Sequence, residues 1–274
     1  MHIRSADGTR LELHDFGGAG RPLLIVHATG FCAGAYRPMA AELAGSFRLW
    51  GLDVRGHGQS DARPDGDMNW GGIAADVRAA AAAIDAGPVV GFGHSLGGGV
   101  ILQAELLSPG TFSAAYLYEP IVFPAGYEPP PAEANPMAAA ARRRRATFGS
   151  RGEVLLRYAS RPPLGELRAD ALAAYVEHGF VELPDGSVTL RCPPEREADT
   201  FAAEGRLTTE QLTGLALPSV LAYGRRGVLS RPRSFIPAIH AAMPKSESRE
   251  FAHLGHFGPL QDPAYVAEDL LARL

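Results

Sequence analysis

The chain has 274 residues, of which 46% are hydrophobic and 20% are charged, and its formal net charge is −4. These values are typical of a soluble globular protein with one large domain and room for an inserted subdomain. They give no electrostatic reason to expect binding to nucleic acid or to an anionic membrane. The first residues contain no long apolar run, so we expect no signal peptide, no membrane helix and a cytoplasmic location.

The predicted secondary structure alternates between strands and helices over most of the chain. Short apolar runs predict strands at residues 10–16, 22–27, 47–52, 88–93, 114–118, 218–223 and 248–251. Helical patterns follow most of these strands, at residues 38–44, 70–84, 96–107, 232–242 and 263–274. This alternation predicts a parallel sheet with helices on both faces.

The alternation is interrupted after Glu119. Residues 120–135 are rich in proline, and residues 136–212 have a mainly helical pattern. Within that helical stretch, residues 181–190 are typical of a hairpin that turns at Asp185-Gly186.

We therefore predict two parts of the chain with different organisation. Residues 1–119 and 213–274 form the α/β core, and residues 120–212 are inserted into it as a mainly helical cap. Insertions after a parallel strand commonly cover an active site, so we expect the cap to determine which substrate is bound.

The pentapeptide Gly93-His94-Ser95-Leu96-Gly97 stands between a predicted strand and a predicted helix. A G-x-S-x-G turn in this setting presents a serine hydroxyl at the carboxyl edge of the sheet. The glycines are needed because the serine backbone is strained and larger side chains would collide with the adjoining strand or helix. In a chain with 32 glycines the pentapeptide alone is a weak signal, so its context has to support it. Ser95 is the predicted nucleophile.

Four segments together resemble the α/β-hydrolase superfamily, in its serine-nucleophile form. They occur in the order found in that family: residues 27–31, 53–61, 93–97 and 255–263. The resemblance covers nearly the whole chain outside the insertion. It implies a mostly parallel eight-stranded sheet flanked by helices, a cap inserted after the sixth strand, and a small-molecule substrate.

A serine hydroxyl needs a general base, and histidine suits this task because its pKa lies near neutral pH. The resemblance assigns the base to His256, in the segment Gly255-His256-Phe257. His94 adjoins Ser95 in the turn, where its side chain should point away from the hydroxyl. We expect the remaining histidines near the motifs to support loops; they are His27, His57 and His253.

The acid that orients this histidine departs from the common pattern of the family. Its usual place is just after the seventh strand, in the form G-x-x-D, but here that segment ends at Gly227. Glu119 follows the sixth strand, where some relatives, among them part of the haloalkane dehalogenase group, carry their acid. The resemblance therefore implies a triad of Ser95, Glu119 and His256. The alternative is that Glu119 is an ordinary loop carboxylate and that the enzyme uses a dyad or another acid.

Acyl transfer also requires hydrogen-bond donors for the oxyanion. The resemblance assigns them to the backbone N–H groups of Leu96 and Thr29, with Gly30 or Phe31 as the alternative to Thr29. Ala28 stands where relatives have glycine, so this loop can differ slightly. The candidate substrate-binding residues beside these motifs are Phe31, Cys32 and His94.

The two cysteines, Cys32 and Cys192, are far apart in the sequence and fit no ligand spacing. We expect two free thiols, no metal and no organic cofactor. The basic run Arg142–Arg145 lies in the insertion, where it is either a solvated face or a docking site for an anionic substrate group or carrier.

The leading hypothesis is a serine hydrolase that cleaves an ester, lactone or thioester through an acyl-enzyme. A C–C bond hydrolase, or a lyase or cyclase acting on a biosynthetic intermediate, would use the same site, since one fold supports many chemistries. A non-catalytic ligand-binding protein is a third hypothesis, to which the glycine at position 227 gives some weight. The substrate and the oligomeric state are left open by the sequence.

Overall fold

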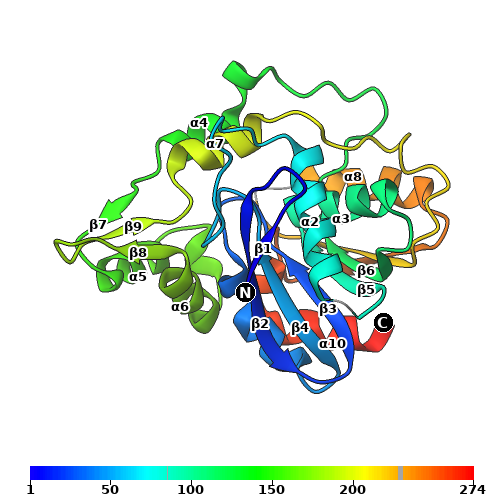
Figure 1. Cartoon of the computed structure of the whole chain (residues 1–274), viewed down its shortest axis with the longest axis horizontal. Helices are drawn as coiled ribbons and strands as arrows, with labels where there is room; N and C mark the ends of the chain where they lie inside the picture. The colour runs from blue at the N-terminus through cyan, green and yellow to red at the C-terminus, as the bar shows by residue number, and fades with distance from the viewer. Residues whose placement is uncertain (85, 228–230) are drawn as a thin grey trace.

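A computed structural model describes residues 1–84, 86–227 and 231–274. Within these residues one sheet has eight strands in the order β1-β2-β4-β3-β5-β6-β10-β11. Their bounds are β1 His2–Arg4, β2 Arg10–Gly18, β3 Arg21–Val26, β4 Phe47–Asp53, β5 Val89–His94, β6 Phe112–Tyr118, β10 Ser219–Gly224 and β11 Ser246–Phe251. Figure 1 shows this sheet at the centre of the molecule.

The predicted mostly parallel sheet is confirmed. The pairs β1–β2 and β2–β4 are antiparallel, and every other neighbouring pair in the sheet is parallel. The edge strand β1 was not predicted, because its three residues are too few to show alternation. The carboxyl ends of the parallel strands meet at one edge, which is where functional loops gather in open α/β sheets.

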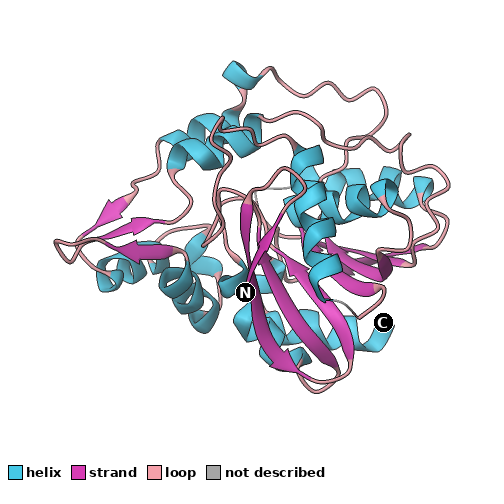
Figure 2. Cartoon of the chain, viewed as in Figure 1, coloured by secondary structure: helices cyan, strands magenta, loops and turns pink. Residues whose placement is uncertain are grey.

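Helices cover both faces of the sheet, as predicted (Figure 2). In β3, Leu23 and Ile25 belong to one buried cluster, whereas Leu24 and Val26 belong to the other. This alternation follows from the two-residue period of a strand, and each buried side chain contributes about 1.5–3 kcal/mol. The helix bounds are α1 Arg37–Leu43, α2 Trp70–Ile84, α3 Leu96–Leu107, α8 Arg231–Ala242, α9 Gly258–Gln261 and α10 Pro263–Arg273.

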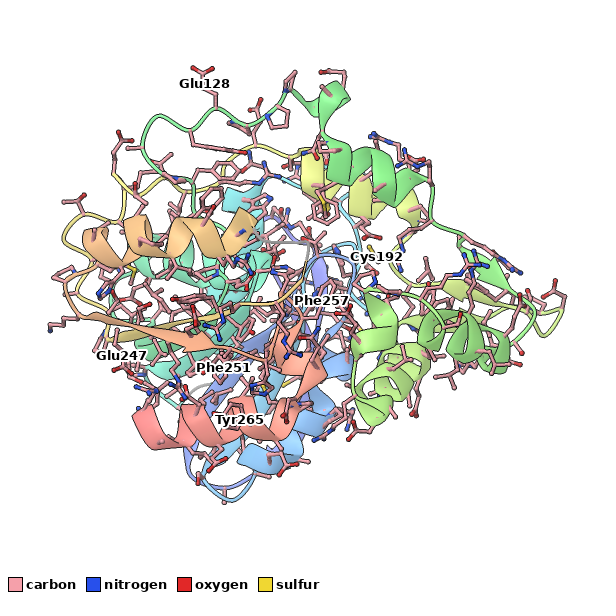
Figure 3. The ribbon with its side chains drawn as sticks, turned by 180° about the vertical axis from the view of Figure 1, so that it is seen from behind. Glu128, Cys192, Glu247, Phe251, Phe257 and Tyr265 are labelled. Atoms are coloured by element: carbon pink, nitrogen blue, oxygen red, sulfur yellow. The ribbon has the colours of Figure 1, made fainter. Side chains whose placement is uncertain are left out.

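The first of these clusters lies between the sheet and helices α1 and α10, and the second lies between the sheet and helices α2, α3 and α8. Figure 3 shows Phe251 of β11 near Tyr265 of α10, and their ring centroids are 5.6 Å apart. The last helix is thus held against the edge of the sheet by an aromatic pair.

Residues 120–212, here called the intervening segment, connect β6 to β10, although these two strands are neighbours in the sheet. The segment has its own antiparallel sheet, ordered β7-β9-β8, and the predicted turn at Asp185-Gly186 is confirmed by the positive φ of Gly186 (82°). Figure 1 shows β7–β9, α5 and α6 beside the main sheet. The bounds are α4 Pro136–Arg142, β7 Thr147–Phe148, α5 Arg151–Ala159, α6 Ala169–His178, β8 Phe180–Glu182, β9 Val188–Leu190 and α7 Pro194–Ala202, with short 3₁₀ turns at Ala132–Ala134 and Leu164–Glu166. Outside this segment, a further 3₁₀ turn at Ala33–Tyr36 precedes α1.

Among the described helices, none combines the length and the apolar character needed to cross a membrane.

Candidate active site

Ser95 occupies the turn between β5 and α3 in a strained backbone conformation. Its φ is 55°, a value that non-glycine residues rarely adopt. The turn is fixed by hydrogen bonds on both sides of the serine: its N–H donates to the carbonyl of Tyr118 (2.9 Å), and its carbonyl accepts from the N–H of Ile121 (3.1 Å). Ser95 is 9% exposed, so its environment is largely desolvated.

The glycines around Ser95 permit close approach of the backbone. A Cβ atom at Gly93 would lie 2.6 Å from the Cα atom of Gly98 in the first turn of α3. A Cβ atom at Gly97 would overlap the carbonyl oxygen of Val26 at the end of β3. The glycines of the pentapeptide therefore allow α3 to start directly against the sheet, as the sequence predicts.

Glu119 and His256 form a buried pair beside this turn. The Nδ1 atom of His256 lies 2.7 Å from Oε2 of Glu119, and the two side chains are 11% and 1% exposed. The other carboxylate oxygen of Glu119 accepts the N–H of Gly224 at 3.0 Å. Because both oxygens have donors, the carboxylate is held in one orientation.

The position of Glu119 follows from the order of the strands. Tyr118 in β6 pairs with Ala222 in β10, and the N–H of Glu119 donates to the carbonyl of Ala222 at 2.8 Å. Glu119 has a φ of 45°, the only described non-glycine residue besides Ser95 with a positive φ. Gly227, at the usual position of the acid, is exposed and has open space around it. The carboxylate that meets His256 thus comes from β6, as the sequence predicts.

The contact with Glu119 determines which nitrogen of His256 carries the proton. An ionised carboxylate only accepts hydrogen bonds, so Nδ1 donates and Nε2 of the neutral ring keeps a free lone pair. This tautomer is the one required of a general base. Within the described residues the Ser95 hydroxyl makes no hydrogen bond to His256; such contacts often tighten only when a substrate is bound.

The predicted oxyanion donors lie in the loop after β3 and at the first residue of α3. Among the described residues, neither the N–H of Thr29 nor that of Leu96 donates a hydrogen bond to another backbone group. The close contact between Gly97 and Val26 brings the start of α3 to the end of β3, from which the Thr29 loop departs. A described backbone acceptor is thus missing for both N–H groups, which is a condition that an oxyanion donor has to meet.

The residues predicted to touch the substrate have different surroundings. Phe31 is 6% exposed, and its ring lies against Tyr175 of α6 (4.7 Å between centroids) and Phe257 (5.4 Å). Figure 3 shows Phe257 at the boundary between the core and the intervening segment. Cys32 is 1% exposed, and burial raises the pKa of its thiol, so this residue belongs to the core and does not reach an open surface.

His94 is fully buried, and both of its ring nitrogens are occupied. Nδ1 lies 2.7 Å from the Tyr36 hydroxyl, and Nε2 lies 2.7 Å from the backbone carbonyl oxygen of His256. Both contacts are with groups other than the Ser95 hydroxyl. Because protein groups occupy both ring nitrogens, neither is left to bind a substrate, which differs from the predicted role of His94 as a substrate-binding residue.

The remaining histidines near the motifs support loops or lie at the surface. His27 donates to the carbonyl of Ala28 (2.8 Å) and accepts the N–H of Val54 (3.1 Å). His57 is also fully buried, and burial lowers its pKa to about 3. His253 is 47% exposed and lies 3.7 Å from Asp262. None of these three contacts Glu119 among the described residues, so His256 is the histidine that the carboxylate orients.

Several residues that stabilise the site were not singled out in the sequence. Tyr118 donates to the carbonyl of Gly255 at 2.9 Å, and Gln261 accepts the N–H of Gly255 at 2.7 Å. Tyr36 contacts both His94 and the N–H of Ala28. The contacts of Tyr118 with Gly255 and of Tyr36 with His94 join distant parts of the chain, so no local sequence pattern marks them.

The basic run in the intervening segment is mostly paired with carboxylates of the same segment. Arg142 contacts Glu195 (3.1 Å) and Arg145 contacts Glu153 (2.7 Å), both on exposed surface. Such exposed pairs contribute about 0–1 kcal/mol. Arg143 is exposed.

Arg144 is different, because its guanidinium turns inward toward the Thr29 loop. It forms an ion pair with Glu197 and donates to the Tyr175 hydroxyl at 3.0 Å, and Tyr175 in turn donates to the carbonyl of Gly30 at 3.0 Å. Burial by itself would lower the pKa of Arg144, but Tyr175 and Glu197 raise it well above its usual range. The intervening segment is thereby anchored to the loop that carries Thr29.

Among the described residues, no group of three or more His, Cys, Asp or Glu side chains is arranged to hold a metal ion.

Comparisons with known proteins relate the whole chain to one family. A family model described as alpha/beta hydrolase matches residues 23–269. The N-formylmaleamate deformylase of Pseudomonas putida is 35% identical over 100 residues, which make up 36% of this chain and 37% of that protein. The chain thus matches less than half of the length of this curated relative and of the others compared.

Solved structures align over nearly their full length. E-2-(acetamidomethylene)succinate hydrolase has a TM-score of 0.79 and 17% identity, covering 100% of this chain and 97% of that one. A malate-bound esterase from Thermogutta terrifontis has a TM-score of 0.75 and 22% identity, covering 99% and 96%. At sequence identities this low, the similarity to these solved structures shows only a shared fold. The family model matches nearly the whole of this chain, so the chain belongs to the alpha/beta hydrolase family.

Proposed function

We propose that this protein is a serine hydrolase that cleaves a carboxylic ester, lactone or thioester of a small organic molecule. Ser95 is the nucleophile, His256 the general base and Glu119 the acid that orients the histidine. The observation that carries the proposal is the 2.7 Å contact between His256 Nδ1 and Glu119 Oε2, buried beside a strained serine turn. Strained, desolvated groups of this kind cluster at active sites.

In the first half of the reaction, Ser95 Oγ attacks the carbonyl carbon of the substrate while its proton passes to Nε2 of His256. The N–H groups of Leu96 and Thr29 stabilise the oxyanion of the tetrahedral intermediate. Glu119 stabilises the imidazolium that forms, since its carboxylate is fixed by the N–H of Gly224. Collapse of the intermediate expels the alcohol or thiol, which takes the proton from His256, and leaves an acyl group on Ser95.

In the second half, a water molecule attacks the acyl-enzyme. His256 Nε2 accepts a proton from the water, and the same two N–H groups stabilise the second tetrahedral intermediate. Collapse releases the carboxylic acid and returns the proton to Ser95. These steps require the substrate and water, and they use no metal and no organic cofactor.

We further propose that residues 120–212 cover this site as a cap on the core formed by residues 1–119 and 213–274. Support comes from the hydrogen bond of Tyr175 to the carbonyl of Gly30, next to the proposed oxyanion donor Thr29. The ring of Phe31 packs between Tyr175 and Phe257, so one aromatic cluster joins the cap to the histidine loop. The substrate's acyl group is expected to contact this cluster.

A fluorophosphonate probe tests the proposal, because it reacts with a serine only when a base activates the hydroxyl. We expect stoichiometric labelling of the wild-type protein and no labelling of the Ser95→Ala variant. With a p-nitrophenyl ester, we expect a burst of nitrophenol equal to the enzyme concentration, as acyl-enzyme accumulates. Absence of labelling in the folded wild-type protein would refute the proposal and favour a ligand-binding role.

A further result separates the hydrolase from its closest alternative. If Ser95 is labelled but neither oxygen esters nor thioesters of varied acyl size are turned over, the same site would serve C–C bond cleavage or a lyase or cyclase reaction. Hydrolysis of esters with a measurable burst would exclude that alternative as the main activity. A structure of the trapped acyl-enzyme would then identify the substrate class.

A further inference from the structure

A buried chain of hydrogen bonds connects the two loops that flank Ser95. The N–H of Ala28 donates to the Tyr36 hydroxyl oxygen at 3.2 Å, and this hydroxyl lies 2.7 Å from Nδ1 of His94. Nε2 of His94 lies 2.7 Å from the backbone carbonyl oxygen of His256. Ala28 immediately precedes Thr29, and His94 immediately precedes Ser95. These hydrogen bonds therefore lead from the loop of the proposed oxyanion donor, through the residue that precedes the nucleophile, to the loop of the proposed base.

The direction of each hydrogen bond is determined by its chemistry. A carbonyl oxygen only accepts, so Nε2 of His94 must carry a hydrogen and donate to the His256 carbonyl. In a neutral imidazole the other nitrogen then accepts, so Nδ1 receives the Tyr36 hydroxyl hydrogen. The Tyr36 oxygen in turn accepts the N–H of Ala28. Donors and acceptors therefore match at each of the three links.

The surroundings keep His94 neutral and fix its position. His94 and Tyr36 are both 0% exposed. The His94 ring has aromatic neighbours on several sides: Tyr36 (6.0 Å between centroids), Tyr118 (5.7 Å) and Phe257 (6.2 Å). Burial lowers its pKa well below the usual range, and the nearby His256 adds to this effect.

A neutral His94 also matters for the reaction itself. Its ring centroid lies only 5.1 Å from that of His256, which becomes positively charged in the proposed mechanism. A second charge at this distance would oppose that step. The neutral ring can instead hold the backbone of His256 in place throughout the cycle.

We propose that Tyr36 and His94 are positioning residues that couple the oxyanion loop to the catalytic histidine. This inference rests on the proposed function and deepens it: the residue that precedes the nucleophile sets the placement of the base. Misplacement of reacting groups by about 1 Å can cost about 10²-fold in rate, so loss of either link should slow acylation more than it weakens substrate binding.

Two substitutions at His94 separate its two hydrogen bonds. In His94→Asn, the amide oxygen can replace Nδ1 as the acceptor for Tyr36, but no donor reaches the His256 carbonyl. In His94→Gln, the amide nitrogen lies near the former Nε2 and can still donate to that carbonyl. We expect kcat to fall about 10- to 100-fold in His94→Asn with KM nearly unchanged, and to recover substantially in His94→Gln.

Tyr36→Phe tests the other end of the chain, and Tyr116→Phe is its matched control. Both hydroxyls are buried, but that of Tyr116 donates to Asp269 at 2.8 Å, away from the two loops. We expect Tyr36→Phe to weaken binding of a boronic acid transition-state analogue about tenfold more than binding of the substrate. Tyr116→Phe should lose stability and keep its kinetic constants.

The measurements are the rate of fluorophosphonate labelling, kcat and KM for a p-nitrophenyl ester, and the melting temperature of each variant. A labelled wild-type protein with an unaffected His94→Asn variant would overturn the positioning role alone. Equal kinetic losses in Tyr116→Phe and Tyr36→Phe would also overturn it, because the effect would then be general. An unlabelled wild-type protein would refute the proposed function itself, and the positioning role with it.

Discussion

The substitution Glu119→Gln probes the least usual feature of the site with almost no change in size. In the wild-type protein, Oε1 accepts the N–H of Gly224 at 3.0 Å, and Oε2 faces Nδ1 of His256 at 2.7 Å. A glutamine amide that keeps the first bond must turn its NH₂ group toward Nδ1, which then has to accept. The opposite orientation would set the NH₂ group against the N–H of Gly224 and leave a donor unpaired.

The expected loss follows from the tautomer of His256. If Nδ1 accepts from the amide, the ring proton moves to Nε2, and the histidine cannot take the proton of Ser95. The corresponding carboxylate-to-amide change in a Ser-His-Asp triad lowers kcat about 10⁴-fold. We expect a loss of about 10³- to 10⁴-fold here, which corresponds to about 4–5 kcal/mol of transition-state stabilisation. KM should change little, because the carboxylate is only 1% exposed and both of its oxygens face protein groups.

The assay is steady-state hydrolysis of a p-nitrophenyl ester, together with the rate of fluorophosphonate labelling. Glu105→Gln is the matched control, since Glu105 is also buried and accepts the N–H groups of Gly110 (2.7 Å) and Phe112 (2.9 Å) at the other end of β6. It should affect stability and leave kcat unchanged. A folded Glu119→Gln protein that keeps kcat within tenfold of the wild type would remove Glu119 from the proposed triad.

Two further predictions concern the stability of the fold. Gly97→Ala should lower the free energy of unfolding, measured by urea titration, by about 1–3 kcal/mol, and it should slow labelling of the nucleophile. The reason is that the new Cβ atom would overlap the carbonyl of Val26. Gly45→Ala is the control, because its Cβ atom would meet open space, and it should change neither quantity. Burial lowers the pKa values of His57 and His94, so the unfolded chain binds these protons near pH 6.5 and the folded chain does not. As the pH falls below about 6.5, the free energy of unfolding should therefore decrease by about 1.4 kcal/mol per pH unit for each such histidine. In urea titrations between about pH 7 and 5, His57→Asn should reduce this dependence on pH. An unchanged pH dependence in that variant would contradict the assignment of His57 as a buried neutral group.

Local sequence patterns were sufficient for the order and type of most elements. The predicted helices at residues 70–84 and 96–107 coincide with α2 and α3. The alanine-rich part of α2 is a run of good helix formers, whereas α3 has three glycines in its first turn and was located by the apolar stretch that follows the serine turn. The strands β1 and β7 were missed, since three and two residues do not establish a period. Their existence depends on pairing with β2 and β9.

Part of the candidate site could also be predicted, because some of its residues are marked by local sequence patterns. Ser95 is marked by its glycines, whose close contacts are a local requirement of the turn. His256 is marked by its place in an ordered series of motifs. Cys32 and His94 were placed near the substrate by adjacency in the sequence, but adjacency does not fix the direction of a side chain, and both are buried in the structure.

The sequence by itself determined the alternation of strands and helices, the serine turn and the absence of an acid at position 227. These features depend on residues that are close together in the chain. Only the tertiary structure decided that Glu119 meets His256, that Tyr36 and His94 link two loops, and that Arg144 faces the loop of Thr29. Each of these contacts joins segments that are distant in sequence. The first two exist because the sheet places β6 beside β10 and β3 beside β5, and the third exists because Tyr175 of α6 contacts both Arg144 and Gly30.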